Sequence, residues 1–176
     1  IVYVGIVVGS VTAPVFDNLK LGQLLFYFGF ISYMILLPIV FYRVFKIGEI
    51  KNVALPTIAI FTAPAGLCLA GYMSSFPQKN IFFLSWLTLL TIISIIAVLL
   101  YLPKMLSVGF YPSFSAFTFP FVITAIGLKI TNNYFINKFK LSFLNYPAHI
   151  IEILSILLVG FVFMKYSIFL LKKSTT

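Results

Sequence analysis

Side chains able to perform acid–base, nucleophilic or metal chemistry are scarce in this sequence. One histidine (His149), one cysteine (Cys68) and three acids (Asp17, Glu49 and Glu152) are spread over 176 residues. Catalytic triads, carboxylate pairs and metal sites each need several such groups close together. No Ser/His/Asp set and no Gly-rich phosphate loop is present either. The sequence therefore predicts no enzyme, no cofactor and no metal site.

The isolated polar groups have structural interpretations. Cys68 lies inside an apolar run, where a small buried side chain is expected. His149 stands beside the start of the last apolar run, and we expect it at the solvated interface, since a haem-carrying subunit usually needs paired axial ligands. Glu152 lies one turn further along, where a charge facing lipid would be costly. We expect it either to reach the interface or to pair with Lys129.

Composition places the chain in a lipid bilayer. Hydrophobic residues make up 62% of it and charged residues only 9%, and the mean hydropathy is +1.15. Soluble domains carry about 25% charged residues, and a soluble particle of this composition would expose a large aggregating apolar surface. The net charge of +9 comes from bases scattered between apolar runs, which is typical of membrane loops. Nucleic-acid binding is therefore not expected.

Six apolar segments are long enough, or nearly so, to cross a bilayer as helices, which takes about 20 residues. Their length and their lack of strict alternation exclude barrel strands. The expected fold class is all-α, a single polytopic transmembrane helical bundle over residues 1–176. The first run has no initiator Met and no basic flank, so we interpret the chain as truncated at its N terminus. The segments cover residues 1–16, 21–44, 53–76, 81–102, 113–131 and 147–171.

Basic residues are unevenly divided between the two ends of these segments. Cytoplasmic loops carry the excess of Lys and Arg, so we expect the C terminus in the cytoplasm. The low charge and the abundant Phe, Ile, Lys and Asn favour a bacterial inner membrane. The richer side holds Arg43, Lys46, Lys51, Lys104, Lys165, Lys172 and Lys173, and the other holds Lys20, Lys79, Lys129, Lys138 and Lys140.

Small, polar and helix-breaking residues gather in the first, third and fifth segments. A proline inside a helix frees a carbonyl that neighbouring helices, hydroxyls or water must satisfy, so these segments belong inside the bundle. Two interpretations remain open: close packing through small residues, or an inner ring of kinked helices around a pore. These segments contain no carboxylate, and such a pore would tolerate anions better than cations.

Three strings within the odd segments resemble one family. They are Tyr3–Ser10 (YVGIVVGS), Ile60–Tyr72 (IFTAPAGLCLAGY) and Tyr111–Ala125 (YPSFSAFTFPFVITA), of which the Ala-Phe-Thr-Phe-Pro string is the most specific. The chain resembles the TehA-like tellurite-resistance and dicarboxylate transporter family, which includes the plant slow anion channels. The resemblance spans essentially the whole chain. It implies helices five to ten of a ten-helix fold, in which five hairpins surround a pore. It also implies a homotrimer. Without helices one to four, the chain alone could not close that ring.

The resemblance also implies site residues. In the family an aromatic ring closes the pore, and its rotamer change opens it; here that position is Phe119. For the threonines, hydrogen bonding to carbonyls of their own helix is the alternative role. The implied pore-lining or kink-forming positions are Gly5, Gly9, Pro14, Thr62, Pro64, Thr118, Pro120 and Thr124.

The sequence thus predicts an anion channel or an organic-anion transporter of the dicarboxylate or tellurite type. Its partners would be the bilayer and small inorganic or organic anions. The alternative is a structural or assembly subunit of a membrane complex without its own permeation path. A proton-coupled carrier is disfavoured because it needs acids within the membrane. A pore requires the small and hydroxyl residues to converge on one axis, whereas a scaffold would use them in pairwise helix contacts.

Overall fold

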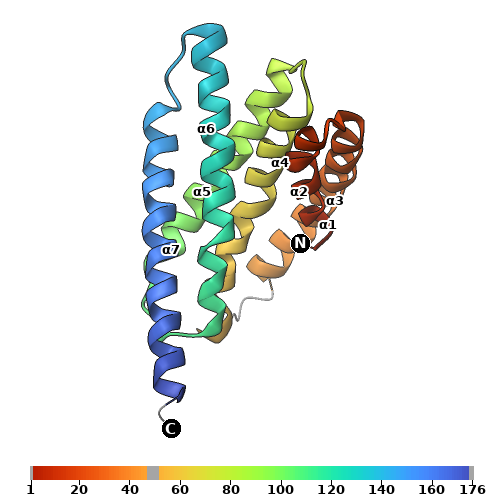
Figure 1. Cartoon of the computed structure of the whole chain (residues 1–176). Coiled ribbons are helices and arrows are strands. Elements are labelled where there is room, and N and C mark those ends of the chain that lie inside the picture. Colours follow the sequence, from red (N-terminus) through yellow and green to blue (C-terminus); the bar gives the residue numbers. More distant parts are fainter. Residues whose placement is uncertain (1, 47–51, 175–176) are drawn as a thin grey trace.

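The computed structural model describes residues 2–46 and 52–174, and within these ranges the chain forms helices and no strand (Figure 1). This confirms the all-α class. Here η marks a 3-10 helix. The elements are α1 (Val2–Gly5), α2 (Val7–Thr12), η1 (Ala13–Phe16), α3 (Leu19–Lys46), η2 (Asn52–Phe61), α4 (Thr62–Ser75), α5 (Ile81–Leu106), η3 (Pro112–Phe117), α6 (Phe119–Phe139) and α7 (Asn145–Ser174).

Five helical stretches of the described chain are long and apolar enough to cross a membrane. The first odd segment, Tyr3–Phe16, is apolar but shorter than a span. This pattern is that of a polytopic helical bundle, in which each backbone group is satisfied within its own segment. The five stretches are Leu19–Val40, Asn52–Ser75, Ile81–Leu106, Pro112–Phe139 and Asn145–Leu171.

The helices form three antiparallel hairpins, α2/α3, α4/α5 and α6/α7. In Figure 1 their turns lie at the upper end and the C terminus lies at the lower end. Asp17 and Lys140 end their helices in the left-handed conformation, with φ of 52° and 59°. The Asn80 side chain caps α5 by accepting the backbone N–H of Phe83 at 3.2 Å, which satisfies one orphan donor of the first turn. Local turn chemistry therefore closes each hairpin.

Helix α4 is the centre of the bundle. It contacts α2, α3, α5 and α6, and every residue of it except Ser74 is buried. The outer helices α3 and α7 instead expose large apolar side chains, such as Ile35 and Phe163. An apolar exterior is stable where acyl chains are the solvent. The interior combines small residues of α4 with large side chains such as Phe26, Phe117 and Phe121.

Helix α6 is longer than the sequence predicts. The predicted segment ends at residue 131, whereas α6 continues to Phe139. The polar residues after 131 lower the hydropathy without breaking the helix. One of them, Asn132, is buried and donates a hydrogen bond to Asn145 at 3.3 Å. In the predicted connector 43–52, residues 47–51, with Glu49 and Lys51, lie outside the described residues.

Candidate functional site

Two odd segments change their helix type at a Thr-x-Pro sequence. Thr62–Pro64 opens α4 directly after η2, and Thr118–Pro120 opens α6 directly after η3. Proline lacks an N–H, and its ring clashes with the carbonyl four residues earlier, so it disfavours continuous α-helical winding from the preceding residues. Each threonine hydroxyl donates to the carbonyl three residues back, Thr62 to Ala59 at 3.1 Å and Thr118 to Ser115 at 2.8 Å. The hydroxyls thus satisfy carbonyls beside each junction.

Four of the predicted site residues meet in the contact between α4 and α6. Thr62 and Thr124 are fully buried, and Pro64 and Pro120 are buried with them. The Thr124 hydroxyl donates to Pro120 of its own helix at 2.7 Å and lies 3.4 Å from the Thr62 carbonyl oxygen. In the described chain these groups hold two helices together and are not exposed on a channel wall.

Phe119 has a different environment. It is the first residue of α6, and 49% of its surface is exposed. Thr118 before it has φ −81° and ψ −82°, outside the usual helical region. Phe119, Val122, Ile126 and Lys129 follow helical spacing, so they share one face of α6. That face is directed away from the buried α4 contact.

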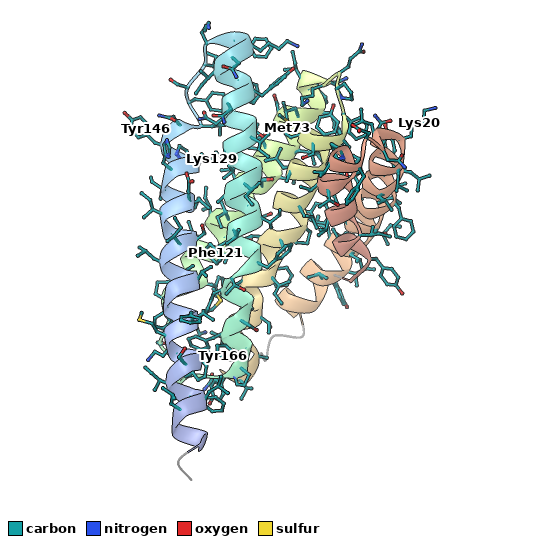
Figure 2. All side chains as sticks on the ribbon, in the orientation of Figure 1. Lys20, Met73, Phe121, Lys129, Tyr146 and Tyr166 are labelled. Carbon is teal, nitrogen blue, oxygen red and sulfur yellow. The ribbon has the colours of Figure 1, made fainter. Side chains whose placement is uncertain are left out.

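A groove of about 350 Å³ runs between α6 and α7 on this face. Val122 and Ile126 line it from α6, and Ile156 and Val159 line it from α7. At its rim Lys129 forms an ion pair with Glu152, which confirms one of the two positions expected for Glu152. Figure 2 shows Lys129 on the side of α6 that faces α7. The groove is therefore apolar inside and charge-balanced at its rim.

His149 and Cys68 have the environments expected of them. The His149 side chain is 60% exposed, and its Nδ1 lies 3.5 Å from a Glu152 carboxylate oxygen. Cys68 is fully buried. Within residues 2–46 and 52–174, no three His, Cys, Asp or Glu side chains gather where they could hold a metal ion. Cys68 is therefore a core residue, and His149 lies at the protein surface beside Glu152.

The first odd segment contributes differently from the third and the fifth. Gly5 is exposed, and a Cβ added to it would contact nothing within 4 Å. A Cβ on Gly9 would meet the Leu25 side chain at 2.5 Å. Pro14 lies in η1 at the end of the segment, directly before the Asp17 turn. Pro14 thus marks the end of the segment, whereas Pro64 and Pro120 lie where a 3-10 helix gives way to an α-helix.

A hydroxyl cluster that the sequence analysis missed joins α2, α3 and α4. Ser75 donates to the Ser10 carbonyl at 2.5 Å, and Ser10 lies within hydrogen-bonding distance of the Gly71 carbonyl (3.2 Å) and of the Ser75 hydroxyl (3.0 Å). Gln23 donates to the Ser75 carbonyl at 3.1 Å. Both serines are fully buried. The small residues around them were a signal for close packing, but their pairing depends on the tertiary structure.

These features define an integral membrane protein: a bundle of apolar helices with a lipid-compatible exterior and close helix contacts at small and hydroxyl residues. The chain belongs to the voltage-dependent anion channel family (SLAC1), which matches residues 1–166. This family match confirms the resemblance inferred from the strings around Tyr3, Thr62 and Phe119. No curated protein and no solved structure matches the chain. The family comprises anion channels and transporters.

Proposed function

We propose that this protein passes small anions along the exposed face of α6 and that the Phe119 ring closes the path. The half-exposed position of Phe119 at the start of α6 is the observation that carries the proposal. An aromatic ring at a narrow apolar point blocks ions sterically and by dewetting, and a rotamer change removes the block. Thr118, directly before Phe119, has an irregular backbone conformation, and we propose that the rotamer change of Phe119 occurs at this position.

The chemistry of this face suits anions. Phe119, Val122 and Ile126 are uncharged, and the described carboxylate nearest to them along the groove, Glu152, is paired with Lys129. The protein as a whole carries a net charge of +9. A positive protein field around an uncharged constriction favours anions over cations. Dicarboxylates and tellurite-type oxyanions are the organic and inorganic substrates that we propose.

The order of the hairpins supports a ring around the path. Helix α4 lies against both helices of the α2/α3 hairpin, and α6 lies against both helices of the α4/α5 hairpin. On the third hairpin, the groove between α6 and α7 corresponds to the position where an inner helix lies against each of the first two hairpins. Within the described residues no helix fills this groove. We propose that the remaining helices of a ten-helix, five-hairpin pore complete the ring beside this hairpin and leave the face of Phe119 toward the path. In this arrangement the protein is a homotrimer with a cytoplasmic C terminus.

A structural subunit without a path remains the second candidate. The small and hydroxyl residues of α4 make pairwise contacts, Gly66 with Thr124 and Gly71 with Val7, as a scaffold would. In our proposal these contacts hold the inner helices close together, and Phe119 and its face supply the path. The two candidates differ in whether the protein conducts anions.

Anion current in planar bilayers tests the proposal. We expect little current through the unmodified protein and a large, anion-selective rise in conductance for Phe119→Ala. Phe163→Ala is the matched control, because Phe163 is an exposed phenylalanine on the outer helix α7. Its conductance should equal that of the unmodified protein. Absence of current in all three proteins, each shown to be folded and inserted, would favour the structural subunit.

A further inference from the structure

Two lysines and a tyrosine from separate segments converge at the end of the bundle opposite the C terminus. Lys79 lies in the turn between α4 and α5, and Tyr134 and Lys138 lie one turn apart near the end of α6. Both Nζ atoms are 5.4 Å from the centroid of the Tyr134 ring. The two Nζ atoms are therefore separated by no more than twice the 5.4 Å that joins each of them to the centroid. The sequence predicts both lysines at this end of the bundle but contains no signal that pairs them.

Each ammonium group is held in place by a hydrogen bond. Lys138 donates to the Tyr134 hydroxyl at 3.0 Å, and Lys79 donates to the Phe76 carbonyl at 2.8 Å. Tyr134 contacts both cations, Lys138 through its hydroxyl and Lys79 through its ring. A lysine ammonium has three N–H donors, so each keeps donors beyond the one named here. The arrangement holds unsatisfied positive charge at a defined place.

This charge has no acidic partner in the part of the chain that the structure describes. The salt bridges found there join Glu152 to Lys129 and to His149, and none reaches Lys79 or Lys138. Partial burial lowers the pKa of Lys79, and the nearby Lys138 charge lowers it further, against an opposing effect of Tyr134. Two like charges kept together while one of them is desolvated favour a shared anion.

We propose that Lys79, Lys138 and Tyr134 form a binding site for a phosphate-type oxyanion. The two ammonium groups supply charge-assisted hydrogen bonds, and Tyr134 holds them at a fixed separation. Lys79 lies between two of the apolar stretches, and Tyr134 and Lys138 lie at the end of a third, where headgroups are expected. A phospholipid headgroup and free inorganic phosphate offer the same chemistry there. The proposal does not depend on conduction, because binding at this rim needs no open path.

Competitive amine acetylation tests the site, with mass spectrometry measuring the labelling rate of each lysine. The whole chain is compared in three media: maltoside micelles, which contain no phosphate, the same micelles with inorganic phosphate, and the same micelles with added phosphatidylglycerol. The free energy of one charge-assisted hydrogen bond corresponds to a change of roughly tenfold in binding. We therefore expect a bound oxyanion to slow the labelling of Lys79 by about that factor. Lys20 is the internal control, since it is exposed at the same end of the bundle (Figure 2).

The media distinguish the sources of the anion. Protection by inorganic phosphate in maltoside micelles supports a free oxyanion, and protection by phosphatidylglycerol alone supports a lipid headgroup. Lys138→Gln should remove most of the protection of Lys79, and Tyr134→Phe should weaken it. Equal labelling of Lys79 in every medium, or equal protection of Lys20, would overturn the proposal. The unmodified chain gives this answer even if a variant fails to fold.

Discussion

Gly66 on α4 lies directly against Thr124 on α6, with no room between them for a methyl group. A Cβ added to Gly66 would be 2.6 Å from the Thr124 hydroxyl oxygen and 2.7 Å from its Cα atom. A Cβ on Gly127 would likewise lie 2.9 Å from the Gly66 carbonyl oxygen. Such close approach of two backbones is how small residues associate membrane helices. It sets the separation of the two Thr-x-Pro segments.

Replacing Gly66 with alanine should therefore separate α4 from α6. We expect a loss of about 1–3 kcal/mol from overpacking, which exceeds the roughly 1 kcal/mol that alanine adds to helix propensity. The thermal unfolding midpoint in detergent, followed by circular dichroism, measures the change. Gly160→Ala on α7 is the control: a Cβ there meets nothing within 4 Å, so its midpoint should stay equal or rise. An unchanged midpoint for Gly66→Ala would contradict the close contact.

Conductance should depend on side-chain volume at residue 119. We expect single-channel current to increase in the order Phe, Leu, Val and Ala, because a smaller side chain leaves a wider and more hydrated path. The neighbouring Phe121 is fully buried and serves as the comparison. Phe121→Ala should cost about 3–5 kcal/mol of stability and should not open the path. A size-independent current at residue 119 would mean that the gate is elsewhere.

The hydroxyl cluster between α2 and α4 should stabilise the packing of the first hairpin. Ser10→Ala removes a group that lies 3.2 Å from the Gly71 carbonyl and 3.0 Å from the Ser75 hydroxyl. Hydrogen bonds between membrane helices contribute about 0.6 kcal/mol on average and up to about 1.7 kcal/mol, and we expect a loss in this range. Ser32→Ala is matched to it, because Ser32 only donates to Phe28 of its own helix. Equal unfolding midpoints for both variants would show that the cluster adds nothing.

The pair of Lys129 and Glu152 should behave as a unit. Removing either partner alone leaves an uncompensated charge at the groove between α6 and α7, whereas removing both leaves none. We therefore expect Lys129→Met and Glu152→Met each to lower the yield of folded protein, and the double variant to recover much of it. Size-exclusion profiles of the detergent-extracted protein measure this. Additive losses in the double variant would show that the two charges act independently.

Hydropathy is a local property, and for this reason the solvent and the class of the protein could be predicted from composition alone. Apolar runs of near-spanning length require a bilayer, whatever their arrangement. The strings around Thr62 and Phe119 predicted the family, which the family match confirms. The pairing of Glu152 with Lys129 was one of two expected outcomes, because an acid inside an apolar run has few alternatives. The role of Phe119 as a gate stays a prediction.

The remaining features of the fold and of the site depend on packing between segments that are distant in the sequence. Thr62 and Thr124 could have faced a pore, but the approach of α4 to α6 through Gly66 buries both at a helix contact. Hydropathy ended the fifth segment at 131, whereas α6 continues to Phe139 because its polar residues remain helical. Lys79 meets Tyr134 only because the α4/α5 turn lies beside the end of α6. Apolar periodicity does not specify which small faces pair, since any two of them can pack closely in lipid.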